Sequence, residues 1–193
     1  MDRSSEFQDL VRKYLNSLYN YALVLTRHVE DAEDLLQESL VRAYGGLHTF
    51  DRSLRFKPWI FTIIRNVQID RQRRRRVRPS EAPLGREEEA EPVVSTESPL
   101  YSIPLAPEDI LVRRETVERV RDAIRRLPPL LRETVELRDI EGLSYGEIAT
   151  IVSRPIGTVM SRLYRGRNLL RTYLVESHQR PGEKGVGVRS DGL

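Results

Sequence analysis

Polar and basic side chains at helical spacing are the residues of this sequence best suited to chemistry, and the chemistry is binding of phosphates and base edges. Near the C-terminus they share one helical face: Thr158, Ser161, Arg162 and Arg165. Arginine binds phosphates or guanine edges, and the free backbone N–H groups at Gly157 can bind a further phosphate. The pattern predicts a helix that lies in the major groove of DNA. A solvated basic face on an ordinary bundle helix is the alternative.

A second group of cations suits single-stranded nucleic acid. Arginines occupy positions 71, 73, 74, 75, 76 and 78, and aromatic and basic residues alternate from Phe50 to Trp59. Basic side chains attract the phosphates of the strand, and aromatic rings stack on unpaired nucleotide bases. The alternative is a solvated arginine run beside aromatic residues of the core, and we expect Trp59 and Phe61 to be core residues.

Acidic residues gather on one face of a helix predicted over 31–46. Asp31 suits the N-cap position, and Asp34, Gln37 and Glu38 lie within the next two turns. Such a face is either simply solvated or a docking surface for a basic helix of a partner.

Helices must position all of these residues, and the sequence predicts an all-α fold. Apolar residues recur at helical spacing in two small domains, residues 5–77 and 108–176, with a helix starting at Pro58 in the first. Residues 78–107 contain prolines and an excess of glutamates, which predicts an extended, acidic, Pro-rich linker. The tail, 177–193, is rich in glycine and charge, which predicts disorder.

A helix-turn-helix is predicted in the second domain. Ser144 and Glu147 match a capping box, so a short helix should start at Tyr145. A longer basic helix should follow the turn Ser153-Arg154-Pro155 and run over about 156–175.

Composition excludes several function classes. The 193 residues include no cysteine, and the three histidines are isolated from one another, without carboxylates at the spacing that a metal site needs. We therefore expect no disulfide, no metal site, no cofactor and no enzymatic activity. The apolar runs are too short for a membrane span and the N-terminus has no apolar signal core, so we expect a cytoplasmic protein.

Several of these segments occur in one order along residues 10–175: Asp31–Glu38, Phe50–Asn66, Asp70-Arg71, Leu127-Pro128, Tyr145–Ala149 and Pro155–Leu163. In this combination the chain resembles the extracytoplasmic-function sigma factors, group IV of the sigma-70 family. The resemblance identifies the two helical segments as sigma domains 2 and 4. It implies a factor that binds core RNA polymerase, directs it to promoter DNA through −35 and −10 elements, and promotes DNA melting.

The resemblance also implies three binding surfaces. The core-polymerase surface comprises Asp31, Asp34, Leu35, Gln37, Glu38 and Arg42. The surface for the −10 element, which captures a flipped base, comprises Arg55, Phe56, Lys57, Arg65, Asn66, Arg71, Arg73 and Arg74. The −35 surface comprises Arg154, Gly157, Thr158, Ser161, Arg162, Arg165 and Arg167.

Two residues depart from the family pattern, because Ser153 and Met160 stand where many relatives carry glycine and lysine. Pro155–Leu163 resembles the branch controlled by zinc-binding anti-sigma factors, which implies an anti-sigma partner of that type. The alternative function is a stand-alone helix-turn-helix regulator, which would bind duplex DNA tightly by itself and dimerise.

Overall fold

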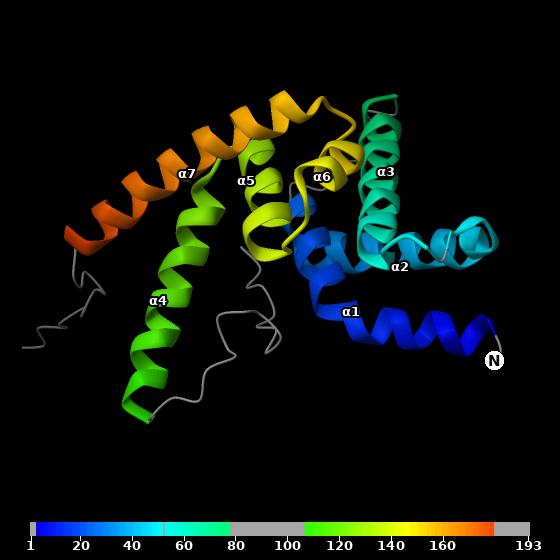
Figure 1. Cartoon of the computed structure of the whole chain (residues 1–193), viewed down its shortest axis with the longest axis horizontal. Coiled ribbons are helices and arrows are strands. Elements are labelled where there is room, and N and C mark those ends of the chain that lie inside the picture. Colours follow the sequence, from blue (N-terminus) through cyan, green and yellow to red (C-terminus); the bar gives the residue numbers. More distant parts are fainter. Residues whose placement is uncertain (1–2, 52, 78–106, 180–193) are drawn as a thin grey trace, which may run out of the picture.

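The computed structural model describes residues 3–51, 53–77 and 107–179, and every regular element in these ranges is helical (Figure 1). The N-terminal domain comprises α1 (Arg3–Thr26), α2 (Val29–Gly46), the short turn η1 (Leu47–Thr49) and α3 (Phe56–Val77). The C-terminal domain comprises α4 (Pro107–Arg126), α5 (Pro129–Val135), the π-helical turn η3 (Glu136–Ile140), α6 (Tyr145–Val152) and α7 (Ile156–Gln179). The all-α prediction is confirmed.

The described ranges include only one residue of the predicted linker and the first three residues of the predicted tail. The linker lies outside them except for Pro107, which begins α4. The predicted tail began at residue 177, but α7 continues to Gln179, so its first three residues are helical. Among the described helices, none combines the length and the apolar character that crossing a bilayer requires.

Two helices of the N-terminal domain begin earlier than predicted. α2 begins at Val29 after His28, so Asp31 is not the N-cap and lies in the first turn, where its charge complements the helix dipole. α3 begins at Phe56, which puts Pro58 at the third helical position. Proline is tolerated there because the first four N–H groups of a helix have no partner within the helix.

The three helices of the N-terminal domain enclose a core of fully buried side chains, among them Leu18, Leu35, Ile60 and Ile64. Burial of such a side chain contributes about 1.5–3 kcal/mol. This core fixes the faces that α2 and α3 present to their surroundings.

In the C-terminal domain, α4 ends at Arg126 and α5 begins at Pro129 after the N-cap Pro128, so the predicted break at Pro128-Pro129 is confirmed. The buried Arg132 then caps α4, because its guanidinium donates to the carbonyls of Ile124 at 3.2 Å and Leu127 at 2.8 Å. α5 and α7 cross closely at Gly166, where a Cβ would lie 2.8 Å from Val135 Cγ2.

The helix-turn-helix forms as the sequence predicts. Ser144 Oγ accepts from Glu147 N at 3.3 Å, and Glu147 Oε2 accepts from Ser144 N at 2.7 Å, which completes the capping box before α6. α6 ends at Ser153, which adopts the left-handed conformation with φ 48° and ψ 50°. α7 follows within three residues.

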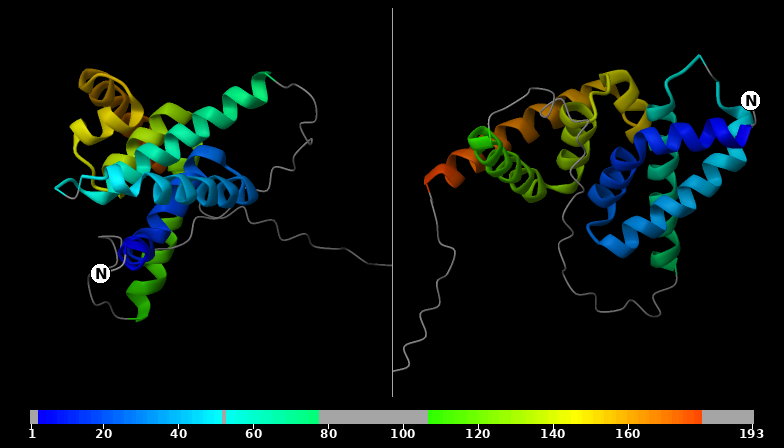
Figure 2. Two further views of the ribbon diagram at one scale, coloured as in Figure 1. Left: turned by 90° about the vertical axis from the view of Figure 1, so that its right-hand side faces the viewer. Right: turned by 90° about the horizontal axis from the view of Figure 1, so that it is seen from below.

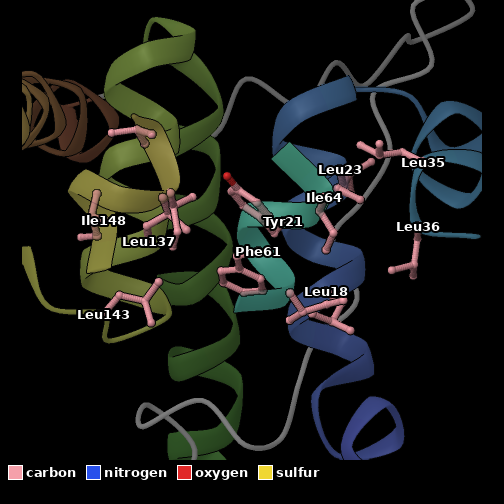
Figure 3. Close-up of a cluster of buried hydrophobic side chains, with 14 of the residues drawn as sticks. Leu18, Tyr21, Leu23, Leu35, Leu36, Phe61, Ile64, Leu137, Leu143 and Ile148 are labelled. Atoms are coloured by element: carbon pink, nitrogen blue, oxygen red, sulfur yellow. The ribbon is translucent and has the colours of Figure 1, made fainter. Parts of the chain in front are cut away.

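The two domains pack against each other, a contact that the sequence analysis did not predict. α6 lies against α3 and α5 lies against α1, as both views in Figure 2 show. Leu137, Leu143 and Ile148 of the C-terminal domain join Tyr21 and Phe61 of the N-terminal domain in one buried apolar cluster (Figure 3). The described part of the chain therefore has one continuous core.

Candidate nucleic-acid interface

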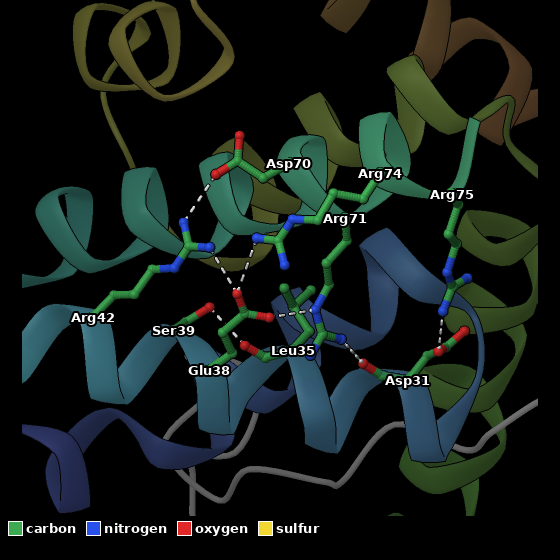
Figure 4. Close-up of polar contacts among 9 residues, drawn as sticks. All are labelled: Asp31, Leu35, Glu38, Ser39, Arg42, Asp70, Arg71, Arg74 and Arg75. Atoms are coloured by element: carbon green, nitrogen blue, oxygen red, sulfur yellow. Dashed lines mark hydrogen bonds and ion pairs between the residues drawn. The ribbon is translucent and has the colours of Figure 1, made fainter. Parts of the chain in front are cut away.

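The acidic face of α2 is largely neutralised by arginines of α3 (Figure 4). Glu38 accepts from Arg71 Nε at 2.8 Å and from Arg42 Nη2 at 2.7 Å. These hydrogen bonds, that from Arg71 first, hold the pKa of Glu38 below its usual range against the opposing effect of burial. Further ion pairs join Arg42 to Asp70, Arg74 to Glu38 and Arg75 to Asp31. Most of the predicted polymerase-binding charges are thus already paired along the α2–α3 seam.

The free face of α2 is narrower than predicted, and part of it is apolar. Leu35 is fully buried in the core of this structure, and its part in the polymerase-binding surface stays a prediction. Asp34 and Gln37 are exposed. One and two turns further, Val41 is 73% exposed and Tyr44 is 51% exposed. Sequence reasoning missed this pair, although the spacing 34, 37, 41 and 44 marks one helical face.

An aromatic cluster underlies the loop before α3. The Phe56 ring is buried, 5.6 Å from Trp59 and 5.9 Å from Phe50 between centroids, with Phe7 and Tyr14 on its other sides. Phe56 is therefore packed in the core of this structure, and its role in contacting DNA stays a prediction. Phe61 is fully buried, as expected, whereas Trp59 is only partly buried.

Three predicted DNA-binding cations of the N-terminal domain instead contact carboxylates of the C-terminal domain. Arg55 Nη1 lies 3.1 Å from Glu147 Oε1, and Arg65 Nε lies 2.7 Å from Glu133 Oε1. Lys57 pairs with the Glu141 carboxylate, and its Nζ donates to the Glu141 carbonyl at 3.3 Å. We call these three contacts the interdomain ion pairs.

The other residues predicted for the −10 surface divide into two groups. Arg71 is partly buried on Glu38, as described above. Asn66, Arg73 and Arg74 are exposed along the outer side of α3. Arg52, in the same loop as Arg55, lies outside the described residues.

The basic face of α7 is mostly open. Arg154, Gly157, Ser161 and Arg165 are exposed, and Thr158 is partly buried. Arg167 is exposed and pairs with Asp139 at 3.0 Å. Exposed apolar residues recur every four positions on the same helix and were not predicted as contacts: Ile156, Met160 and Tyr164.

Arg162 differs from its neighbours on α7 because it is buried. Its Nη1 has no hydrogen-bond partner among the residues that the structure describes. Burial lowers the pKa of the guanidinium, opposed by the negative charge of Glu133 and reinforced by nearby Arg154 and Arg65. In this arrangement Arg162 cannot reach DNA.

Two sequence families match the chain: Sigma-70 region 2 over residues 10–78 and Sigma-70 region 4 over residues 117–170. The ECF RNA polymerase sigma factor SigW of Bacillus subtilis (strain 168) is 32% identical over 168 residues, which cover 87% of this chain and 88% of that protein. The chain belongs to the extracytoplasmic-function (ECF) sigma factors of the sigma-70 family. As an ECF sigma factor it serves promoter-directed transcription, and it is an initiation factor rather than a catalytic enzyme.

One further relative is similar in sequence, and two solved structures are similar in fold. The sigma-E factor of Haemophilus influenzae is 33% identical over 166 residues, which cover 85% of each chain. The sigma factor RpoE, solved in complex with the anti-sigma factor NepR from Bartonella quintana, has a TM-score of 0.64 and 27% identity, covering 88% of this chain and 97% of that one. CnrH, solved with the cytosolic domain of CnrY, shares the fold with a TM-score of 0.57 at 22% identity over 90% of each chain.

Proposed function

We propose that this sigma factor docks on core RNA polymerase through α2, binds the −10 element through the loop 50–57 and α3, and binds the −35 element through α7. The observation that carries the proposal is the helix-turn-helix, which exposes Arg154 in its turn and Ser161 and Arg165 on its second helix. A helix of this kind fits the major groove and contacts both phosphates and base edges.

Melting would proceed by capture of an unpaired base. Unstacking a base costs a few kcal/mol, and a binding pocket offsets this cost by stacking and hydrogen bonding. The exposed Asn66, with its amide donors and acceptor, and the exposed Arg73 and Arg74 are suited to bind the base and the phosphates of the strand. No covalent step is required of this chain.

Simultaneous binding of both elements requires the two domains to separate. Two sites two helical turns apart lie roughly 70 Å from each other on DNA. A chain of about 30 residues reaches at most about 100 Å when fully extended. The acidic linker is long enough only when stretched, and a basic channel of the polymerase would hold it in that form.

An anti-sigma factor is a further proposed partner. RpoE from Bartonella quintana, a similar sigma factor, was solved bound to one. The zinc-binding type of anti-sigma factor is supported only by the resemblance of Pro155–Leu163. Zinc analysis of a partner that co-purifies with the chain tests that point.

Transcription by purified core RNA polymerase, with and without the chain, tests the whole proposal. We expect promoter-specific transcripts only when the chain is present. The alternative, a stand-alone helix-turn-helix regulator, predicts tight binding of the isolated chain to duplex DNA as a dimer and no dependence of core polymerase on it. That second result would overturn the proposal.

The polymerase-docking surface gives a sharper prediction. Asp34→Arg reverses a charge on the free face of α2, where no described residue pairs with it, so we expect core binding to fall at least tenfold with the fold unchanged. Glu33→Arg is the matched control, since it reverses the neighbouring exposed acid on the side of α2 that faces Tyr19. Affinity is measured by fluorescence anisotropy. Equal losses in both variants, or no loss in Asp34→Arg, would remove α2 from the docking surface.

A further inference from the structure

The outward side of α7 carries no charge in the turns that follow the turn of the helix-turn-helix. Four exposed residues occupy this side at the spacing i, i+3, i+4 and i+7: Gly157, Met160, Ser161 and Tyr164. Val159 and Leu163, on the opposite side of the helix, are buried in the core. We call the four exposed residues the central ridge, because they face away from the core of the domain.

The cations of the helix-turn-helix lie at the borders of the central ridge. At about 3.6 residues per turn, Arg165 falls on one side of the ridge and Arg167 on the other, and Arg154 precedes its N-terminal end. Within the described ranges Arg154 and Arg165 are in no ion pair, so their charges are available to phosphates. A helix in the major groove has a phosphate backbone on either side and base edges in front of it. The arginines are therefore placed for the phosphates, and the central ridge for the bases.

Two members of the central ridge are apolar and largely exposed. Met160 is 52% exposed and Tyr164 is 70% exposed, so burial of either side chain against an apolar group of DNA would be favourable. Ser161 Oγ donates to the Thr158 carbonyl at 3.0 Å, which leaves this hydroxyl to act as an acceptor. In the major groove, the apolar group that base pairs present is the C5-methyl group of thymine. The ridge thus matches a methyl group better than a hydrogen-bonding edge.

We propose that Met160 and Tyr164 read the C5-methyl groups of pyrimidines in the −35 element. The methyl group can belong to thymine or to 5-methylcytosine, since both bases project it from C5 into the major groove. This inference rests on the proposed function, because it requires α7 to lie in the groove. The arginines then supply affinity, whereas the methyl contacts select the sequence and make the chain sensitive to methylation of cytosine.

The test starts from a duplex that the complete assembly prefers. Core RNA polymerase carrying the full-length chain selects duplexes from a pool of random sequence, and the enriched upstream motif supplies the positions to be probed. Uracil in place of a thymine of this motif removes one methyl group and leaves the base pairing unchanged. Replacement of the same A·T pair by G·C, with cytosine or with 5-methylcytosine, varies the same methyl group in a different base pair.

Both changes should alter affinity by the effect of one buried methyl group. We expect uracil to lower affinity about fourfold at each thymine that the ridge contacts. At the same positions, 5-methylcytosine should bind about fourfold more tightly than cytosine. Competition between labelled and unlabelled duplexes for the assembly gives both ratios. The absence of a response to both changes would overturn the proposal.

Met160→Ala and Tyr164→Ala assign the methyl effects to the central ridge. Each variant should abolish the fourfold ratio at the positions that its side chain contacts, with the salt dependence unchanged, because neither removes a charge. Val175→Ala is the matched control, an exposed apolar residue of the same helix that lies about 16 Å beyond Tyr164 along the axis, more than the groove width of about 12 Å. Ratios that stay at fourfold in both ridge variants would place the effect in the DNA itself and overturn the proposal.

Arg165→Ala separates methyl reading from phosphate binding. This variant should weaken binding of every duplex alike and leave the methyl ratios unchanged. A methyl effect that disappears in Arg165→Ala but persists in both ridge variants would overturn the proposal. An assembly that enriches no upstream motif would overturn the proposed function of α7 and this inference with it, whereas an enriched motif that is insensitive to methyl groups would overturn this inference alone.

Discussion

Glu136 is a carboxyl group whose surroundings shift its pKa strongly. It is buried in the π-helical turn, and burial, followed by the nearby charge of Glu141, raises its pKa from 4.5 to about 8. Arg121, Lys57 and Arg132 act in the opposite direction without cancelling the effect of burial. The residue is therefore protonated in the folded chain at neutral pH.

This protonation makes stability depend on pH. Between about pH 4.5 and 8 the folded chain keeps a proton that the unfolded chain releases, so the free energy of unfolding falls as pH rises, by at most about 1.4 kcal/mol per unit. Glu136→Gln removes the titration, and we expect it to flatten the slope and to stabilise the protein at pH 8 more than at pH 5. Urea denaturation at both pH values measures this difference. Parallel profiles for the two proteins would contradict the assignment.

The sequence predicted the kinds of residue at the binding surfaces better than their exposure. Asn66, Arg73, Arg154 and Arg165 are exposed, as a binding role requires. Leu35, Phe56 and Arg162 are buried. A motif gives the residue type and the order, but the packing of neighbouring helices decides which side chains reach solvent. For Arg162 the neighbours are the helices that pack around α7, which are α4, α5 and α6.

At the scale of the element, the turn of the helix-turn-helix carries the clearest strain. Ser153 adopts φ 48° and ψ 50°, a conformation that costs a residue with a Cβ about 1–2 kcal/mol. The resemblance to the family implies glycine at this position, so the serine in the sequence already indicated a turn without an easy left-handed residue. Helix starts were less predictable, because α2 begins two residues before the acid that appeared to be its cap.

Replacement of Ser153 by glycine should relieve this strain. We expect Ser153→Gly to stabilise the protein by about 0.5–1 kcal/mol, since the gain in the turn exceeds the extra entropy of the unfolded chain. Ser161→Gly, the same change inside a helix, should destabilise it by about 0.5 kcal/mol. Thermal unfolding followed by circular dichroism distinguishes the two. A fall in melting temperature in both variants would show that the turn is not strained.

At the scale of the whole molecule, the sequence predicted two helical domains on an extended linker. In the structure the two domains share one core. The contacts that join them connect residues far apart in sequence: Arg55 and Glu147 are separated by 92 in residue number, and Arg65 and Glu133 by 68. Such pairs leave no periodic pattern that a single sequence could reveal. The fold of each domain was predictable, but their mutual arrangement was not.

The three interdomain ion pairs should not contribute equally to the contact between the two domains. Arg65 and Glu133 are 14% and 6% exposed, whereas Arg55 and Glu147 are 63% and 22% exposed. Arg65→Ala leaves a buried carboxylate without its cation, so it should open the molecule strongly. Arg55→Ala removes an exposed pair worth about 0–1 kcal/mol and should change little. The distance between spectroscopic labels placed on the two domains measures the effect of each variant. A larger effect of Arg55→Ala would reverse the ranking of the pairs.

The aromatic cluster beneath the loop 50–55 has a practical consequence. Trp59 is the only tryptophan in the chain, and its ring lies 4.7 Å from that of Phe50. A fluorinated indole incorporated there would give a single fluorine resonance, whose position depends on the ring currents of its aromatic neighbours. Because the tryptophans of an unlabelled polymerase stay silent in such a spectrum, this one nucleus could follow the loop inside the assembled transcription machinery while a promoter opens.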